Sequence, residues 1–383
     1  MWSRLARCSP LCSTRRTVTL APDLASIAPS KRPRGARAST RPGVPLAAAL
    51  VSLVAVVLSG CANRQPSPTS GSVTVDMSAV AGWAWIDKGH ILISRAVNEG
   101  DPATRYRLSE VDIATGAFQT IELPQIQDCI RTDYLLPTRA TDGRIVAVRR
   151  CIPRAVSGDW PTWIVDVTLE PALSVELTPD LSPGKVLNVS SVSWDSSAER
   201  GVVAFGSLIC QTIAGVSKAG LSPLDITVGD GATFNVGDRL AGGLRLDCSD
   251  TGQADHPSLG VGDIVAFDAS AAAMGLSGEA RLSVPGEVYT ASFDGGMARA
   301  LVRVRQPISG LAIAPSGACM AIGGILDGPG EGTFLIRMDG SSPRRVLMDA
   351  VNPRWQPDGS GLGGIRIPPS GVPELVIASV GCD

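Results

Sequence analysis

The chain is poor in the side chains that usually carry acid–base chemistry. Its 383 residues include only two histidines, His90 and His256. A Ser-His-Asp hydrolase would need one of them beside a serine on a strand-to-helix turn, and no Gly-x-Ser-x-Gly motif occurs in that context. Each histidine instead fits a position in a repeated strand pattern, His90 after a turn and His256 before Pro257 at a strand start. The sequence therefore predicts no catalytic residue.

Three other groups could bind a ligand, and a structural role is favoured for each. Four aspartates could gather a calcium ion, but no calcium-loop spacing is matched, and solvated turns explain them better: Asp225, Asp230, Asp238 and Asp247. The glycine pairs of the same region lack the Lys-Ser/Thr of a phosphate loop. Trp160 and Trp163 could present aromatic rings to a glycan or peptide, yet Trp163 alternates with Val165 as a strand core residue would. We expect neither a metal nor a cofactor.

The N-terminal region has the layout of an export signal. Residues 44–58 form an apolar run that follows five basic residues between positions 31 and 41. The next residues, Leu58-Ser59-Gly60-Cys61, resemble the bacterial lipobox, which implies cleavage before Cys61 and a diacylglycerol on its sulfur. The alternative is a transmembrane anchor, but such a helix needs about 20 apolar residues. The resemblance implies a palmitate-type lipoprotein held to the cell membrane through Cys61.

Composition divides the chain into three parts. Residues 1–60 form the signal region, of which residues 1–30 exceed an ordinary signal and suggest a mis-assigned start. Residues 61–71 are a Pro/Ser-rich tether that cannot bury a core. Residues 72–383 form the folded domain. We expect this domain on the extracytoplasmic side of a bacterial cell envelope.

The folded part is acidic. The chain holds 34 Lys and Arg and 36 Asp and Glu, and nine of the basic residues but only Asp23 of the acidic ones lie in residues 1–60. The remainder lacks the clustered basic residues that phosphate contacts require, so nucleic-acid binding is excluded.

A repeated unit organises this part of the chain. With 42 Gly and 28 Pro, the composition favours many turns over long helices. Six segments share an extended approach, a turn and an apolar strand, at intervals of about 42 to 61 residues: 82–95, 137–150, 192–207, 257–270, 311–324 and 353–366. Several continue into a third strand that ends in Asp-x-x-Gly, and then a fourth. The pattern predicts an all-β fold, a six-bladed β-propeller of four-stranded antiparallel blades.

Two copies carry a family resemblance. Pro353-Arg354-Trp355-Gln356-Pro357-Asp358-Gly359 and Pro315-Ser316-Gly317 are similar to the WD40-like repeats of TolB-like six-bladed propellers. The resemblance covers residues 72–383, although copies two to four are eroded and the N-terminal α/β domain of TolB is absent. It implies the propeller fold, and it does not carry the role of TolB to this chain.

The last repeat has room for only three strands, ending at residues 375–380. Residues 72–77 form a Val-Thr-Val strand, and the segment after it parallels the connection that precedes residue 353. Because an open blade would expose unpaired backbone groups, we expect residues 72–77 to complete the last blade.

The folded part contains six cysteines, an even number in an exported chain, which predicts disulfides. The repeat places four of them toward one face of the ring, in connections between blades or at the end of a second strand, and two toward the other. We therefore expect three pairs: Cys129 with Cys151, Cys210 with Cys248, and Cys319 with Cys382. A metal site is disfavoured, because no Cys-x-x-Cys occurs.

These features favour a non-catalytic module that binds or scaffolds a protein or small ligand in the envelope. A propeller offers a ring of loops and a channel mouth for a partner. The alternative is an enzyme of the propeller hydrolase or lactonase kind with a metal in the central channel, which would need acidic, Asn or His side chains converging on the axis. A third possibility is an accessory protein of an envelope complex.

Overall fold

The computed structural model describes residues 70–97, 105–139, 142–153, 161–167, 174–176, 188–195, 199–207, 210–217, 219–230, 232–236, 253–270, 285–326, 330–341 and 343–382. They all belong to one compact unit, Gln65–Asp383. The predictions for residues 1–60, for Cys61 and for most of the tether lie outside this part of the chain. The described residues contain no helix long and apolar enough to cross a membrane.

Four of the sheets are antiparallel and four-stranded, as the repeat predicts. The first contains β2 (Val80–Trp85), β3 (His90–Val97), β4 (Arg105–Asp112) and β5 (Phe118–Thr120). The second contains β6 (Cys129–Arg139), β7 (Ile145–Pro153), β8 (Thr162–Asp166) and β9 (Ser174–Glu176). The third contains β10 (Asn188–Trp194), β11 (Arg200–Ser207), β12 (Cys210–Ser217) and β13 (Gly220–Ser222). The fourth has the order β1 (Ser70–Asp76), β25 (Glu374–Ser379), β24 (Gly361–Arg366) and β23 (Ala350–Trp355).

A larger, curled sheet occupies the rest of the ring. Its main path runs from β16 (Gln253–Leu259) through β17 (Ile264–Ser270), β18 (Pro285–Ser292), β19 (Gly295–Ile313), β20 (Cys319–Leu326) and β21 (Gly330–Arg337) to β22 (Arg344–Met348). The hairpin of β14 (Ile226–Asp230) and β15 (Ala232–Val236) joins it through a parallel contact between β14 and β19. The sequence did not predict this hairpin.

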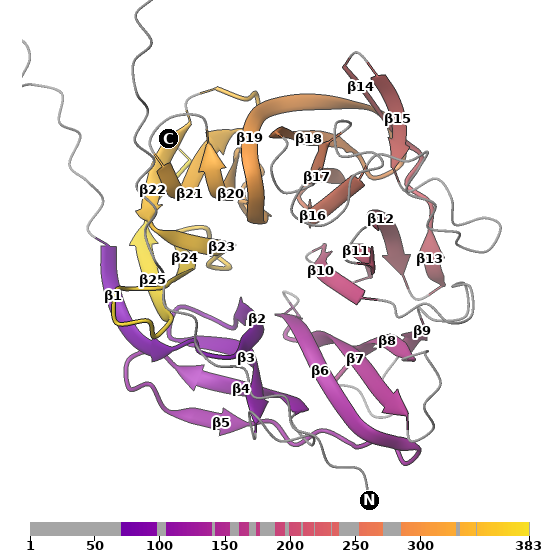
Figure 1. Cartoon of the computed structure of the whole chain (residues 1–383). Coiled ribbons are helices and arrows are strands. Elements are labelled where there is room, and N and C mark those ends of the chain that lie inside the picture. The colour runs from indigo at the N-terminus through magenta and orange to yellow at the C-terminus, as the bar shows by residue number, and fades with distance from the viewer. Residues whose placement is uncertain are drawn as a thin grey trace, which may run out of the picture. The chain divides into compact units, whose positions relative to one another are not determined.

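The 19-residue strand β19 makes this sheet continuous. Its first part, up to Arg305, pairs with β18. Val304, Arg305 and residues 310–313 pair with β20, with a register irregularity between Arg305 and Gly310. The repeat pattern predicted a break between an outer strand and the next inner strand at this place. The chain instead bends without leaving the sheet, which the long arc of β19 in Figure 1 shows.

The sheets are arranged like the blades of a propeller. The strand that begins each repeat contacts its counterparts on both sides, in the cycle β2, β6, β10, β16, β19, β23 and back to β2. These strands surround the centre of Figure 1, while β5, β13 and β22 lie toward the rim. The all-β, propeller-like arrangement predicted from the sequence is therefore confirmed.

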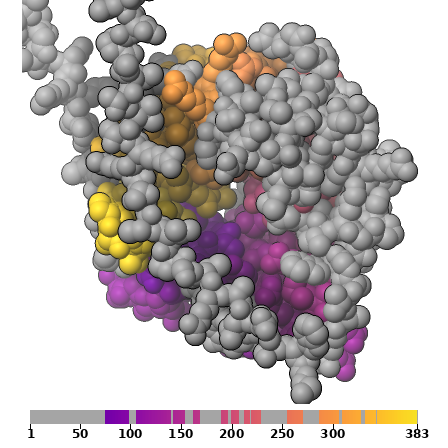
Figure 2. Space-filling model, viewed as in Figure 1, coloured from indigo at the N-terminus to yellow at the C-terminus, as the bar shows by residue number. Residues whose placement is uncertain are grey.

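The two ends of the described chain share one sheet. β1 pairs antiparallel with β25, with Ser72 opposite Val376 and Val73 opposite Leu375. The amide of Met77 also donates to the carbonyl of Pro373 at 2.8 Å. In Figure 2 the yellow C-terminal residues accordingly lie close to the indigo start of the described chain. The predicted pairing of residues 72–77 with the last strand is confirmed, and the strand begins two residues earlier.

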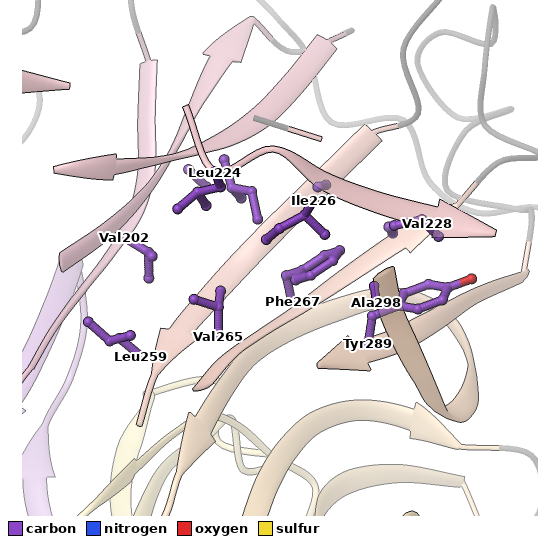
Figure 3. Packing of buried hydrophobic residues seen from close by; sticks show 13 residues of the cluster. Val202, Leu224, Ile226, Val228, Leu259, Val265, Phe267, Tyr289 and Ala298 are labelled. Atoms are coloured by element: carbon purple, nitrogen blue, oxygen red, sulfur yellow. The ribbon is translucent and has the colours of Figure 1, made fainter. Parts of the chain in front are cut away.

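Apolar side chains from neighbouring sheets fill the spaces between them. One cluster joins Val202 of β11 and Ile226 of β14 to Val265 and Phe267 of β17 (Figure 3). Another packs Trp83 and Trp85 against Val75 of β1 and Leu375 of β25. The predicted packing role of the first-strand tryptophans is confirmed, because Trp83, Trp85 and Trp355 are buried and Trp194 packs against a cluster.

The predicted positions of two cysteines are corrected by the structure. Cys129 was placed in a connection between blades, but it is the first residue of β6, because that strand starts eight residues before Pro137. Cys210 was placed at the end of a second strand, but its backbone opens β12 and pairs with Ser207 across a tight hairpin. Both errors arose because strands extend further into the connections than the turn signals suggest.

Candidate functional site

The innermost strands carry a cluster of charged residues centred on His256. β16 contains a bulge at this point, because its register with β17 shifts between Asp255 and Ser258. His256 has φ 47°, an uncommon backbone conformation for a residue other than glycine, and Pro257 follows it. Its backbone amide donates to Oδ1 of Asp255 at 2.7 Å. The bulge turns the side chain away from ordinary strand alternation.

The same bulge recurs in other first strands. Leu136 and Asn352 also have positive φ, each precedes a proline, and each lies at a register shift in β6 or β23. The bulge is therefore a property of the repeat, and the residue at the positive-φ position differs between first strands. At His256 the repeat places a titratable group on an innermost strand.

The imidazole of His256 is paired with a buried carboxylate. Its Nδ1 lies 2.8 Å from Oδ1 of Asp268 on β17, whose side chain is 6% exposed, while the histidine side chain is 23% exposed. Burial by itself would lower the pKa of His256, but the charges of Asp255 and Asp268 and the hydrogen bond to Asp268 outweigh burial and raise the pKa to about 9. At neutral pH His256 is an imidazolium, and its Nδ1–H donates to Asp268.

Asp255 connects this cluster to the neighbouring sheet. Its Oδ1 accepts a hydrogen bond from the hydroxyl of Ser190 on β10 at 2.8 Å. The serine hydroxyl thus donates to a carboxylate, and no contact joins it to the imidazole of His256 among the described residues. A Ser-His pair of the hydrolase type is therefore not formed here.

Arg354 brings a second positive charge from β23. Its guanidinium Nη1 donates to the carbonyl of Pro353 at 3.1 Å, and its own carbonyl accepts the indole N–H of Trp85 at 2.9 Å. Burial lowers the pKa of Arg354 to about 10. The charge of Arg354 also opposes protonation of His256. β16, which carries His256, and β23, which carries Arg354, both contact β19 in the ring.

These residues can hold an anion more readily than they can move a proton. An imidazolium whose pKa lies two units above neutrality is already protonated and cannot act as a general base at pH 7. An imidazolium and a guanidinium both donate hydrogen bonds to anionic groups. The two side chains therefore present hydrogen-bond donors to an acceptor.

The other predicted residues have structural roles. His90 begins β3, as predicted, and its Nδ1 lies 2.9 Å from Oδ1 of Asp87 in the preceding turn. The hydrogen bond to Asp87 raises the pKa of His90. Trp163 lies on β8 and is covered by the guanidinium of Arg149, 4.8 Å from the ring centre. Trp160 lies outside the described residues.

Disulfides form at two of the three predicted places. The structure joins Cys129 to Cys151 and Cys319 to Cys382. Cys248 and the side chain of Cys210 fall outside the described part of the chain, so their pairing stays a prediction, as does the lipidation of Cys61.

The described residues do not bring acidic groups together for a cation. They contain no group of three or more His, Cys, Asp or Glu that could hold a metal ion. Asp225 lies before β14, where its carbonyl accepts the amide of Gly296 at 3.1 Å, and its exposed side chain agrees with a turn position. Asp238 and Asp247 lie in segments that the structure does not describe.

A second charged cluster, in the β6–β7 region, has a structural explanation. The side chain of Asp133 is fully buried, and its carboxylate lies 3.1 Å from both Nε of Arg131 and Nη2 of Arg150. The backbone amide of Tyr106 on β4 also donates to it at 3.0 Å. Asp133 therefore joins the first sheet to the second and is balanced within the protein.

Comparison with known proteins finds only distant structural similarities. No protein-family model matches the chain, and no curated protein sequence matches it. TolB from Acinetobacter baumannii aligns with 77% of the chain at 13% identity and a TM-score of 0.47, and the match spans 65% of that protein, less than two thirds of its length. An oligogalacturonate lyase from Vibrio parahaemolyticus aligns with 83% of the chain and 95% of its own length at 12% identity and a TM-score of 0.44. A glucose dehydrogenase aligns with 82% of the chain and 100% of its own length at 13% identity and a TM-score of 0.49. Similarities at this level carry no functional assignment.

The sequence did not single out the charged cluster. His256 was interpreted only as a strand-start residue, and Arg354 only as part of the repeat. A signal was present, because His256 precedes Pro257 and Arg354 follows Pro353, so both stand beside the proline of a first strand. Which inner strands face each other across the ring depends on the closed structure.

Proposed function

We propose that this chain is a lipid-anchored β-propeller of the cell envelope that binds a protein or small ligand at its centre and catalyses no reaction. The pairing of His256 with the buried carboxylate of Asp268 is the observation that carries this proposal. A histidine held as an imidazolium by Asp268 and Asp255 suits recognition and is unsuited to taking a proton from a nucleophile.

We further infer that the ring contains six blades. The curled sheet divides at the irregularity in β19, so that β16, β17, β18 and the start of β19 form one blade, and the end of β19 with β20, β21 and β22 forms the next. The closed cycle of six first strands supports this division.

The anchoring part of the proposal rests on the export signal, the lipobox and the tether. β1 begins at Ser70, nine residues after Cys61, and it is hydrogen-bonded to β25 along its length. Nine residues span at most about 30 Å, so a lipid on Cys61 would hold the propeller close to the membrane surface.

Membrane fractionation tests the anchor. Replacing Cys61 with Ala should move the protein from the membrane fraction to the soluble fraction, while the wild type takes up labelled fatty acid. Equal membrane association of both proteins, without labelling of the wild type, would contradict lipid anchoring.

Site-specific photo-crosslinking tests the binding role. Val261, in the turn after β16, and Met348, at the end of rim strand β22, are similarly exposed at 63% and 62%. A photoreactive residue at position 261 should give a defined adduct in the native envelope, identified by mass spectrometry, and one at position 348 should not. Absence of any adduct from position 261, or the same adducts from both positions, would contradict ligand binding at the centre.

A further inference from the structure

Arg354 is a partly buried cation, and no carboxylate among the described residues pairs directly with its guanidinium. Among the described residues its guanidinium donates only to the carbonyl of Pro353. Burial lowers the pKa of Arg354 to about 10, and no carboxylate in the described part of the chain offsets this effect. The nearby acidic groups are already engaged, Asp268 with His256 and Asp255 with Ser190 and the amide of His256.

Such an arrangement is unfavourable unless a counter-ion is supplied. Removing a charge from water costs free energy that only an opposite charge or several hydrogen bonds restore. Arg131 and Arg150 follow this rule, since they share Asp133. Arg354 has no such carboxylate partner among the described residues. A second cation, His256, lies on another innermost strand.

We propose that Arg354 and His256 form a recognition site for a carboxylate group of the bound ligand, an inference that rests on the proposed binding function. The planar guanidinium has a fork of donors that fits the two oxygens of a carboxylate. Nδ1 of His256 is bound to Asp268, and no hydrogen bond with Nε2 is formed by the residues that the structure describes. Both side chains are partly exposed, so a ligand can reach them.

The local charge favours a monovalent anion. His256 and Arg354 contribute two positive charges, and Asp255 and Asp268 contribute two negative charges. A carboxylate adds one negative charge beside the guanidinium, whereas a divalent sulfate or phosphate would meet stronger repulsion from both aspartates. On this charge count we expect a carboxylate to bind better than a phosphate-type ligand.

Thermal unfolding of the full chain in detergent tests this site. At pH 7 and constant ionic strength, replacing sodium chloride with sodium acetate should raise the Tm of the wild type in a concentration-dependent way, because the ligand binds the folded state. Arg354→Met should lose this added shift. In chloride alone Arg354→Met should melt at or above the wild-type Tm, since an unbalanced buried charge is replaced by an apolar chain.

Arg366→Met is the matched control. Arg366 lies in the same sheet but is paired with Glu374, so its variant should keep the acetate-dependent shift. Acetate has a general effect on protein stability that is the same for every variant. The difference between the acetate-dependent Tm shifts of the two methionine variants therefore measures binding at Arg354. Arg354→Lys keeps the positive charge but lacks the planar fork of donors, so it should retain part of the acetate-dependent shift. It also serves as a second test of the site if Arg354→Met does not fold.

The results divide clearly. An acetate shift that is the same in wild type, Arg354→Met and Arg366→Met overturns the site, as does a larger arginine-dependent shift with sulfate than with acetate. A tetraglutamate peptide that acts at a concentration at least about tenfold below acetate, equivalent to about 1.4 kcal/mol, supports the site and assigns the carboxylate to a polypeptide partner. Equal potency supports it and assigns a small acid. Crosslinking from position 261 does not depend on Arg354. A negative result in the acetate experiment would therefore overturn the carboxylate site without overturning the proposed binding function.

Discussion

At the scale of single residues, Asp133 and Arg354 show two ways in which this protein holds charge away from water. Asp133 is fully buried but lies between two guanidinium groups and accepts a backbone amide. Arg354 has one hydrogen bond to a carbonyl and no carboxylate beside it in the described structure. Removing Asp133 would leave two arginine charges without their counter-ion. Removing the side chain of Arg354 would leave no charge without a partner.

We expect Asp133→Ala to lower the free energy of unfolding by about 3 to 5 kcal/mol, because Arg131 and Arg150 would lose their shared counter-ion. Chemical denaturation measures the change. Asp358→Ala is the control, since Asp358 pairs with Lys88 at 2.7 Å but both side chains are well exposed. That change should cost less than about 1 kcal/mol. Equal losses in the two variants would show that burial does not determine the value of these ion pairs.

At the scale of elements, neighbouring inner strands are joined by indole hydrogen bonds. Trp85 donates to the carbonyl of Arg354, and Trp355 donates to the carbonyl of Ala312, each at 2.9 Å. Each bond therefore runs from one innermost strand to the strand before it in the ring. The bond from Trp85 joins the first repeat to the last.

Trp85→Phe should destabilise the fold more than Trp83→Phe. Both rings are buried, but Nε1 of Trp83 has no hydrogen-bond partner in the described structure. The two substitutions remove similar apolar volume, and only Trp85→Phe leaves the carbonyl of Arg354 without its donor. We expect a difference of about 1 to 2 kcal/mol in denaturation experiments. A Trp83→Phe variant as unstable as Trp85→Phe would remove the interstrand role of the indole bond.

Local patterns predicted most of these elements, and long-range pairing accounts for what they missed. Turn residues such as Asp358-Gly359 and the apolar runs beside them located all six first hairpins. The uninterrupted course of β19 and the β14–β15 hairpin escaped notice, because each depends on partners distant in sequence. The charged cluster was missed for the same reason, since His256 and Arg354 are 98 positions apart and meet only in the ring.

At the scale of the whole molecule, β1 closes the ring between its two ends. Its pairing with β25 covers a strand edge that would otherwise expose unpaired backbone groups. Val75 and Met77 also fill the apolar cluster around Trp83 and Trp85. The N-terminal strand therefore contributes both hydrogen bonds and core packing.

Two truncations test this contribution. Deleting residues 62–69 should leave the Tm nearly unchanged, because a Pro/Ser-rich tether contributes little folding energy. Deleting residues 62–78 removes β1 and should lower the Tm by several degrees or cause aggregation through the open edge of β25. Identical melting of the two truncated proteins would mean that the ring does not need its N-terminal strand.

The central claim is that the middle of this ring recognises an anion and does no acid–base catalysis, and it depends on the protonation of His256. A folded-state pKa of about 9, above the ordinary 6.5, means that His256 contributes stability that is fully present below pH 6.5 and is lost as the pH rises through 9. The shift corresponds to about 3 kcal/mol.

NMR titration of the imidazole protons measures this pKa directly. The chain has only two histidines, and a His90→Gln variant assigns the signals. We expect the His256 signal to titrate near pH 9, and we expect the hydrogen bond to Asp87 to raise the pKa of His90 above its ordinary value. A His256 signal that titrates at or below pH 6.5 would make this residue a neutral imidazole at physiological pH, and would contradict the assignment of the site to binding.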